Sequence, residues 1–152
     1  MEALVLRNAE FKDVPQMAEM EKLCFSDPWS EDLMRADVVS NNDISTYIVA
    51  EQEGEIVGYL GIWTVMDECQ INNVAVHPRM RRQGIGALLV STVLSATEEA
   101  GITYWTLEVR ENNQEAIALY EKMGFKIIAK REKYYDDGEA AYVMARGTRS
   151  EG

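Results

Sequence analysis

Residues 68–89, ECQINNVAVHPRMRRQGIGALL, run from an apolar strand through a glycine-containing loop into an apolar helix. Gly84 and Gly86 let the backbone approach a ligand closely, and the amides at the start of a helix point outward at the positive end of its dipole. Arg81 and Arg82 add donors that bind phosphate in a bidentate way. This stretch predicts a phosphate-binding turn, with a glycine turn that binds no ligand as the alternative.

The loop differs from the two commonest phosphate-binding motifs. A dinucleotide-binding fingerprint needs a third glycine where this chain has Leu89, and a P-loop needs a lysine where it has Ala87. The remaining pattern is Arg-x-x-Gly-x-Gly-Ala over residues 81–87. This pattern alone does not identify the ligand that carries the phosphate, so the ligand has to be inferred from the rest of the chain.

Predicted strands and helices alternate on both sides of this turn. Before it we expect a strand at 4–9, helices at 11–25 and from Ser30, a hairpin at 46–65 that turns at Glu53-Gly54, and a strand at 68–78. After it we expect a helix at 86–100, a strand at 102–110 buried on both faces, a helix at 112–123 capped by Asn112 with Glu115, and a closing hairpin of 125–135 and 139–145. Because no linker or repeat divides these elements, one α/β (α+β) domain over residues 1–152 is expected, with 147–152 as a loose tail.

Composition excludes several classes of protein. The 152 residues are 47% hydrophobic and 27% charged, and we expect neither a transmembrane helix nor a secretory leader. The formal net charge of −11 disfavours a broad nucleic-acid interface and favours a basic partner, unless the surface is simply acidic. Cys24 and Cys69 lack metal-type spacing, so we expect no metal site and a reducing, cytoplasmic setting.

Residues 68–89 resemble the acetyl-CoA-binding signature of the GCN5-related N-acetyltransferase (GNAT) superfamily, and the order of elements is similar over nearly the whole chain. The resemblance implies a central mixed, mostly antiparallel sheet flanked by helices, with acetyl-CoA as co-substrate. Three further segments are similar to the RimI type, the ribosomal-protein alanine N-acetyltransferases: CFSDPWSE (24–31), LEVRENNQEAIALYEKMGF (107–125) and KYYDDGEAAYVM (133–144). The expected substrate is the N-terminal alanine of a basic small-subunit ribosomal protein.

The same resemblance implies which residues bind acetyl-CoA. The strand backbone would bind the pantetheine arm, the loop would bind the pyrophosphate, and an asparagine further along would contact CoA. These residues are Val74, Ala75, Val76, Arg81, Arg82, Gln83, Gly84, Ile85, Gly86, Ala87 and Asn113. Asn113 also suits the cap of a helix.

Two residues are candidates for the chemistry of acetyl transfer to an amine. An α-amino group, with a pKa near about 8, must lose a proton, and the departing thiolate gains one. Glu108 interrupts an apolar strand and is the general base that the resemblance implies, with an ion pair to Arg110 or Lys130 as the alternative. Tyr120 is the implied proton donor, with ordinary core packing as the alternative.

Aromatic residues in two segments predict the walls of a peptide groove. They are Phe25, Trp29, Tyr134 and Tyr135, and a core cluster is the alternative reading. Direct transfer is expected, because neither cysteine has an evident histidine partner for a covalent step. Two rival functions stay open at this point: acetylation of a small-molecule amine, and a non-catalytic CoA-binding module. Whether the chain is a monomer or a weak dimer is also open.

Overall fold

The computed structural model of the chain describes residues 4–25, 28, 30–39 and 45–149. Within them, seven strands form one sheet in the order β1-β2-β3-β4-β5-β7-β6. The elements are β1 (Val5–Asn8), a 3-10 turn η1 (Phe11–Asp13), α1 (Val14–Cys24), α2 (Glu31–Val39), β2 (Ser45–Gln52), β3 (Glu55–Val65), β4 (Glu68–Val76), a 3-10 turn η2 (Pro78–Met80), α3 (Ile85–Glu99), β5 (Tyr104–Arg110), α4 (Gln114–Lys122), β6 (Lys126–Arg131) and β7 (Ala141–Gly147).

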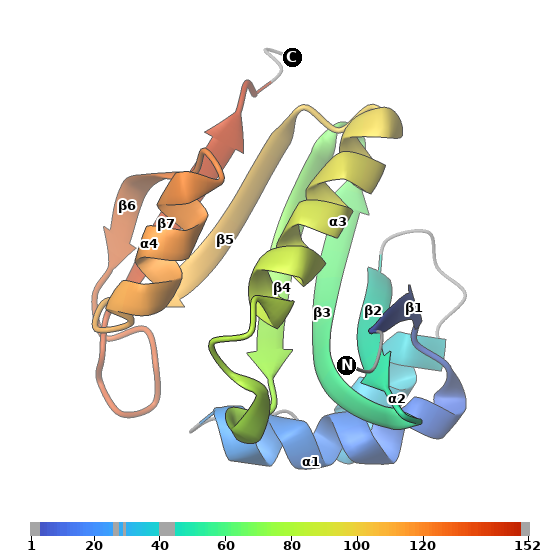
Figure 1. Cartoon of the computed structure of the whole chain (residues 1–152). Helices are drawn as coiled ribbons and strands as arrows, with labels where there is room; N and C mark the ends of the chain where they lie inside the picture. Colours follow the sequence, from blue (N-terminus) through green and yellow to red (C-terminus); the bar gives the residue numbers. More distant parts are fainter. Residues whose placement is uncertain (1–3, 26–27, 29, 40–44, 150–152) are drawn as a thin grey trace.

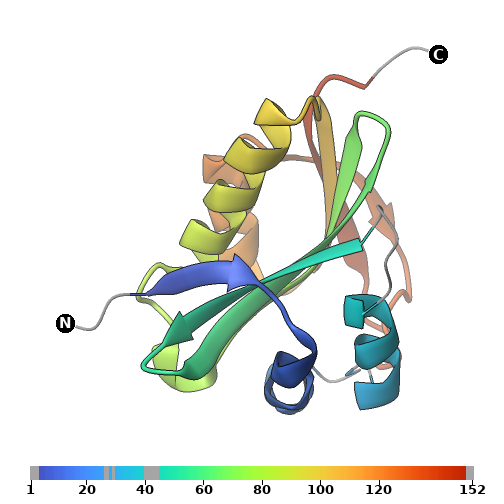
Figure 2. The ribbon, with the colours of Figure 1, turned by 90° about the vertical axis from the view of Figure 1, so that its right-hand side faces the viewer.

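The sheet separates two layers of helices. Helices α3 and α4 lie on one face, and α1 and α2 lie on the other, below β2, β3 and β4 (Figures 1 and 2). Each layer covers its own apolar cluster: one includes Leu89 and Trp105, and the other includes Met17 and Tyr59. Every strand pair is antiparallel except β4 with β5. The predicted mixed, mostly antiparallel sheet flanked by helices is confirmed.

Local turn signals account for the first hairpin. Glu53 and Gly54 both have positive φ, of 52° and 80°, as a two-residue turn between antiparallel strands requires. Ser30 begins the second helix as predicted, because its hydroxyl accepts a hydrogen bond from the Leu33 amide at 3.2 Å. No helix in the described part of the chain is long and apolar enough to cross a bilayer.

The prediction that residues 102–110 are buried on both faces is wrong. Along β5, exposure alternates: Trp105, Leu107 and Val109 are buried, whereas the residues between them are half-buried. The reason is that α3 and α4 cover only one face of β5, and α1 and α2 lie under other strands (Figure 1). The second face of β5 is therefore available for a site.

Three predictions at the C-terminal end need correction. The cap of α4 is Asn113 and not Asn112, because the Asn113 side chain accepts the Ala116 amide at 3.2 Å, and the predicted box with Glu115 does not form. The last hairpin is not tight: β6 ends at Arg131 and a loop of residues 132–140 precedes β7. The tail is not loose from residue 147, since Gly147 belongs to β7 and pairs with Tyr104.

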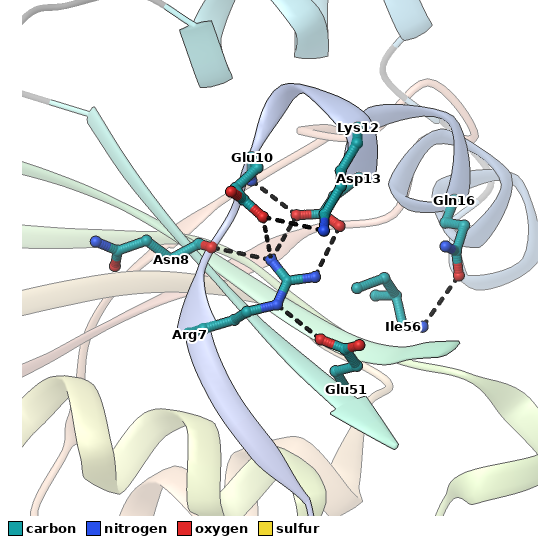
Figure 3. A network of polar contacts seen from close by, with 8 residues as sticks. All are labelled: Arg7, Asn8, Glu10, Lys12, Asp13, Gln16, Glu51 and Ile56. Carbon is teal, nitrogen blue, oxygen red and sulfur yellow. Dashed lines mark hydrogen bonds and ion pairs between the residues drawn. The ribbon is translucent and has the colours of Figure 1, made fainter. Parts of the chain in front are cut away.

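A partly buried ion pair joins β1 to the turn η1 that precedes α1. Arg7 donates two hydrogen bonds to the Asp13 carboxylate, at 2.8 and 2.9 Å, and one to Glu51 on β2 at 2.7 Å (Figure 3). Asp13 also accepts the Glu10 amide at 2.7 Å and is only 2% exposed. These hydrogen bonds, that of Arg7 first, lower the pKa of Asp13.

Replacing Asp13 with Asn is expected to lower the free energy of unfolding by about 2–3 kcal/mol near neutral pH, because hydrogen bonds to charged groups are lost. The lowered pKa means that this stabilisation is present above the ordinary aspartate pKa of about 3.9, and is lost as the pH falls through the still lower value of the folded protein. Urea denaturation of both proteins at pH 7 and at stepwise lower pH measures the difference. A difference that does not shrink in acid would contradict this account.

Candidate active site

The strands β4 and β5 lie side by side only at their beginnings. Residues 68–71 pair with residues 104–107, and the two strands then separate toward their C-terminal ends (Figure 1). The separation begins where β4 carries an extra residue, Asn72, because Ile71 and Asn73 face consecutive residues of β3. Such a bulge bends a strand and increases its twist. The β5-facing edge of β4 beyond Ile71 is thus open to hydrogen bonding with an extended ligand.

The extra residue also changes the direction in which the following side chains point. Ile71 packs in the cluster under α3, whereas Ala75 packs in the cluster under α1. Asn73 faces α1 as well: its side-chain amide donates to Glu21 of α1 at 3.2 Å, and the buried Tyr59 hydroxyl donates to the same oxygen. Glu21 is 1% exposed. This hydrogen-bonded group holds the bulged part of β4 against α1, and sequence reasoning missed it although the polar pair Asn72-Asn73 interrupts an apolar strand.

The predicted phosphate loop lies at the end of β4. Arg82 and Gly84 have positive φ, of 65° and 79°, and Gly84 is the N-cap of α3. The first amides of α3, including those of Gly86 and Ala87, have no partner within a helix. The Ile85 side chain is buried in the core, so only its backbone is available to a ligand. The loop therefore directs backbone N–H donors and the positive end of the α3 dipole toward the same anion-binding position at the start of α3.

The arginines of this loop are exposed and weakly held. Arg82 lies 3.7 Å from Glu115, with both side chains exposed, and Arg81 donates to the Val76 carbonyl at 3.4 Å. The Cys24 thiol donates to the same carbonyl at 3.3 Å. The Val76 carbonyl already accepts two hydrogen bonds, and the Ala75 backbone pairs with Tyr59 of β3, in the register in which the His77 amide donates to the Val57 carbonyl. The Val74 backbone and the Val76 amide, which point to the other edge of β4, are therefore the candidates for contacts with an extended ligand, and the Ala75 backbone is not. Both arginine side chains are free to move toward an anion.

Gly86 tests whether the loop holds an anion. Its φ is not positive, and an added Cβ would meet only the Val76 side chain, at 3.6 Å, which is an ordinary contact. Replacing Gly86 with Val is therefore expected to leave the fold intact while blocking close approach of a pyrophosphate to the backbone. The loss of a charge-assisted hydrogen bond predicts affinity for CoA weakened by about 10–100-fold.

Calorimetric titration with CoA measures this effect, and thermal unfolding without CoA is the control for the fold. Unchanged affinity in a folded Gly86→Val protein would move the phosphate site elsewhere.

Glu108 lies on the face of β5 that no helix covers. Its side chain is 20% exposed, and its Oε2 atom is buried without a hydrogen-bond partner among the described residues. The Arg131 Nε lies 3.7 Å from this oxygen. The alternative pairings considered above are wrong: Arg110 binds Asp137 and Glu139, and Lys130 binds Glu111 and Glu132. The Glu108 carboxylate therefore has a nearby cation, but its Oε2 atom accepts no hydrogen bond from the described residues.

Tyr134 and Tyr135 of the 132–140 loop lie beside Glu108. Burial, together with a hydrogen bond to Glu108, raises the pKa of Tyr134. Burial is also the main cause that raises the pKa of Tyr135 to about 12, and Glu108 adds to it. The two rings meet edge to face at 5.0 Å, and the Arg110 guanidinium lies 3.9 Å from the centre of the Tyr135 ring. The structure thus brings both predicted groove tyrosines to the candidate base.

Tyr120 lies on α4, on the other side of the sheet from Glu108. It is 8% exposed and packs edge to face on Phe125, with ring centres 6.0 Å apart, so the predicted core packing is present. Burial raises the pKa of its hydroxyl to about 12, and the nearby Tyr135 adds to the shift. Tyr135 thus interacts electrostatically with both candidate catalytic groups, Tyr120 and Glu108.

Other predicted residues are less directly involved. Phe25 packs against the apolar cluster under α1, and Trp29 lies outside the described residues, so this wall of the groove stays a prediction. Asn113 uses its side-chain oxygen to cap α4, and its side-chain amide nitrogen can still donate to a ligand. Burial raises the pKa of both Cys24 and Cys69, so neither is activated as a thiolate. No cluster of metal-ligating side chains occurs in the described ranges.

Comparisons with known proteins cover nearly the whole chain. Residues 14–125 match the acetyltransferase (GNAT) family. A Bacillus subtilis protein provisionally named ribosomal protein bS18 alanine N-acetyltransferase is 36% identical over 140 residues, covering 91% of this chain and 92% of the relative. The Escherichia coli K12 ribosomal protein bS18 alanine N-acetyltransferase is 32% identical over 145 residues, covering 92% and 95%. The crystal structure of the Escherichia coli ribosomal-protein-S18-alanine N-acetyltransferase has a TM-score of 0.88 at 31% identity, over 99% of this chain and 97% of that one.

Proposed function

We propose that this chain, which belongs to the GNAT acetyltransferase family, acetylates the N-terminal alanine of a small-subunit ribosomal protein in the cytoplasm. It is an N-terminal acetyltransferase that uses acetyl-CoA. The relatives' names support this substrate. The observation that carries the proposal is the buried Glu108 oxygen, which has no hydrogen-bond partner within the described ranges and lies where β4 and β5 separate. An N-terminal ammonium would supply the missing donor.

Glu108 is the general base of this proposal. At neutral pH most of an α-amino group is protonated, since its pKa is near about 8, and it reacts only after losing a proton. The Glu108 carboxylate accepts that proton, directly or through water, and the freed lone pair attacks the thioester carbonyl carbon. The hydrogen bond from Tyr134 orients the carboxylate. The uncovered face of β5 lets a peptide N-terminus reach it.

The chain's backbone orients the acetyl donor. Acetyl-CoA supplies the acetyl group as a thioester when it is bound. The open edge of β4, at the Val74 backbone and the Val76 amide, would bind its extended arm, and the amides and arginines at the start of α3 would bind its pyrophosphate. Donors from β4 would polarise the carbonyl. The Tyr120 hydroxyl, on the opposite side of the sheet from Glu108, would hydrogen-bond the sulfur as the C–S bond breaks. The second proton lost by the attacking nitrogen would pass through solvent to the sulfur, which would leave as the thiol.

Net charge supports a basic substrate. The chain carries a formal charge of −11, and an acidic surface raises the rate at which basic peptides arrive. Ribosomal proteins bind RNA phosphates and are correspondingly basic. A peptide that starts with alanine followed by arginine is therefore the first probe.

The proposal is tested with a panel of four acceptors under saturating acetyl-CoA. The panel holds a peptide starting Ala-Arg, one starting Ala-Glu, the Ala-Arg peptide already N-acetylated, and the polyamine spermidine. We expect kcat/KM for the Ala-Arg peptide to exceed that for spermidine by about tenfold or more, with no reaction of the N-acetylated peptide. The ratio of the Ala-Arg to the Ala-Glu rate is expected to fall as salt screens the charges.

Other outcomes would overturn the proposal. Preferential acetylation of spermidine, or of lysine side chains in the blocked peptide, would make the substrate a different amine. Binding of CoA without acetylation of any acceptor would favour the non-catalytic module.

A further inference from the structure

Arg131 occupies the position next to the candidate base that a substrate's amino group needs. Its Nε lies 3.7 Å from the buried Glu108 Oε2, close enough for ion pairing but too long for a hydrogen bond. The Arg131 side chain is 58% exposed, and its guanidinium lies 5.8 Å from the centre of the Tyr134 ring. The arginine thus covers the carboxylate from the solvent side and is not locked there.

The strand that carries Arg131 favours movement of its side chain. All residues of β6 are exposed, and among the described strands β6 is the last of the sheet and pairs only with β7. The exposed guanidinium lies beyond hydrogen-bond distance of Glu108, so the pair is weak, and an incoming ammonium would replace its charge beside the buried Oε2. Glu108 in contrast stays fixed by the central strand β5 and by Tyr134.

We propose that Arg131 is a placeholder for the substrate's α-ammonium group: it neutralises Glu108 in the free enzyme and must be displaced when the peptide N-terminus binds. This inference rests on the proposed function, because it takes Glu108 as the group that receives the amine. Two cations cannot occupy the same side of one carboxylate without repulsion, so Arg131 competes with the ammonium of the substrate. It does not compete with a neutral N-acetylated terminus. Arg131 is in this sense a positioning residue that makes binding selective by charge.

The test compares Arg131→Gln with wild type, using the Ala-Arg peptide as acceptor. Removal of the competing cation is expected to lower the peptide KM by about two- to fivefold, the range expected from the strength of exposed ion pairs. The KM for acetyl-CoA and the inhibition constant of the N-acetylated Ala-Arg peptide are expected to stay unchanged, because neither presents an ammonium group at Glu108. Arg131→Lys keeps the charge and is expected to restore the wild-type peptide KM.

A matched control separates this effect from net charge. Lys126→Gln removes the same charge from the same exposed strand without touching the Glu108 pair, and should leave the peptide KM at its wild-type value. An unchanged or higher peptide KM in Arg131→Gln would overturn the inference. Equal changes in peptide KM and in the inhibition constant of the N-acetylated peptide would overturn it too, since they would indicate a structural role. Failure of the wild-type protein to acetylate the Ala-Arg peptide would instead reject the proposed function.

Discussion

Replacing Glu108 with Gln is expected to lower turnover at pH 7 by about 10²–10⁴-fold, the usual effect of losing a positioned general base. Glutamine keeps the shape of the side chain but cannot accept the proton of the incoming ammonium. Reaction then depends on the small fraction of amine that is already neutral. Below the amine's pKa of about 8, that fraction rises tenfold with each pH unit, so activity of the variant should recover steeply as the pH rises.

Turnover measured from about pH 6 to 10 under saturating substrates distinguishes this behaviour from simple damage. The matched control is Glu111→Gln, which removes a neighbouring carboxylate that pairs with Lys130 and not with the site. The control should keep wild-type turnover within a fewfold and the wild-type pH profile. A Glu108→Gln enzyme with an unaltered rate and profile would assign the proton to another group or to water.

Tyr120→Phe is expected to lower turnover by about 10²–10³-fold while leaving acetyl-CoA affinity and stability nearly unchanged. Phenylalanine keeps the ring that packs on Phe125 and loses only the hydroxyl. Because burial raises the pKa of Tyr120 to about 12, the hydroxyl keeps its proton throughout the working range. A thiol has a pKa near about 8.5, so Tyr120 is a weaker acid than the thiol it would generate. Its main contribution is therefore a hydrogen bond to the sulfur as negative charge develops.

The raised pKa gives this prediction a second measurement. In the free wild-type enzyme, ionisation of Tyr120 should not lower kcat/KM until the pH approaches about 12. Below pH 10, the pH profiles of wild type and Tyr120→Phe should therefore have the same shape. Single-turnover rates isolate the chemical step, and CoA titration controls for binding. Wild-type turnover in Tyr120→Phe would return this residue to a packing role. A decline near pH 9 that disappears in the variant would contradict the buried, protonated state.

Some of the candidate site could be predicted from the sequence because its signals are local or belong to a family pattern. Turn and cap residues act within a few positions of the chain, which explains the hairpin at Glu53-Gly54 and the start of the second helix at Ser30. Gly84 at the start of α3 is a local signal of the same kind. Even here neighbours compete: Asn112 and Asn113 are chemically equal as caps, and only the course of the chain after β5 selects Asn113.

The sequence by itself determined the order of elements, the glycine loop at the start of a helix, and the candidacy of Glu108 and Tyr120. Only the tertiary structure decided that Glu108 pairs with Arg131, although Arg110 and Lys130 were equally available from the sequence. It also decided that β5 is covered on one face, and that a single extra residue at Asn72 separates β4 from β5. The physical reason is the distance along the chain between the residues that interact. Caps and turns depend on neighbouring residues, whereas strand register, the cover of a sheet face and the partner of a charge depend on segments that meet only in the folded chain.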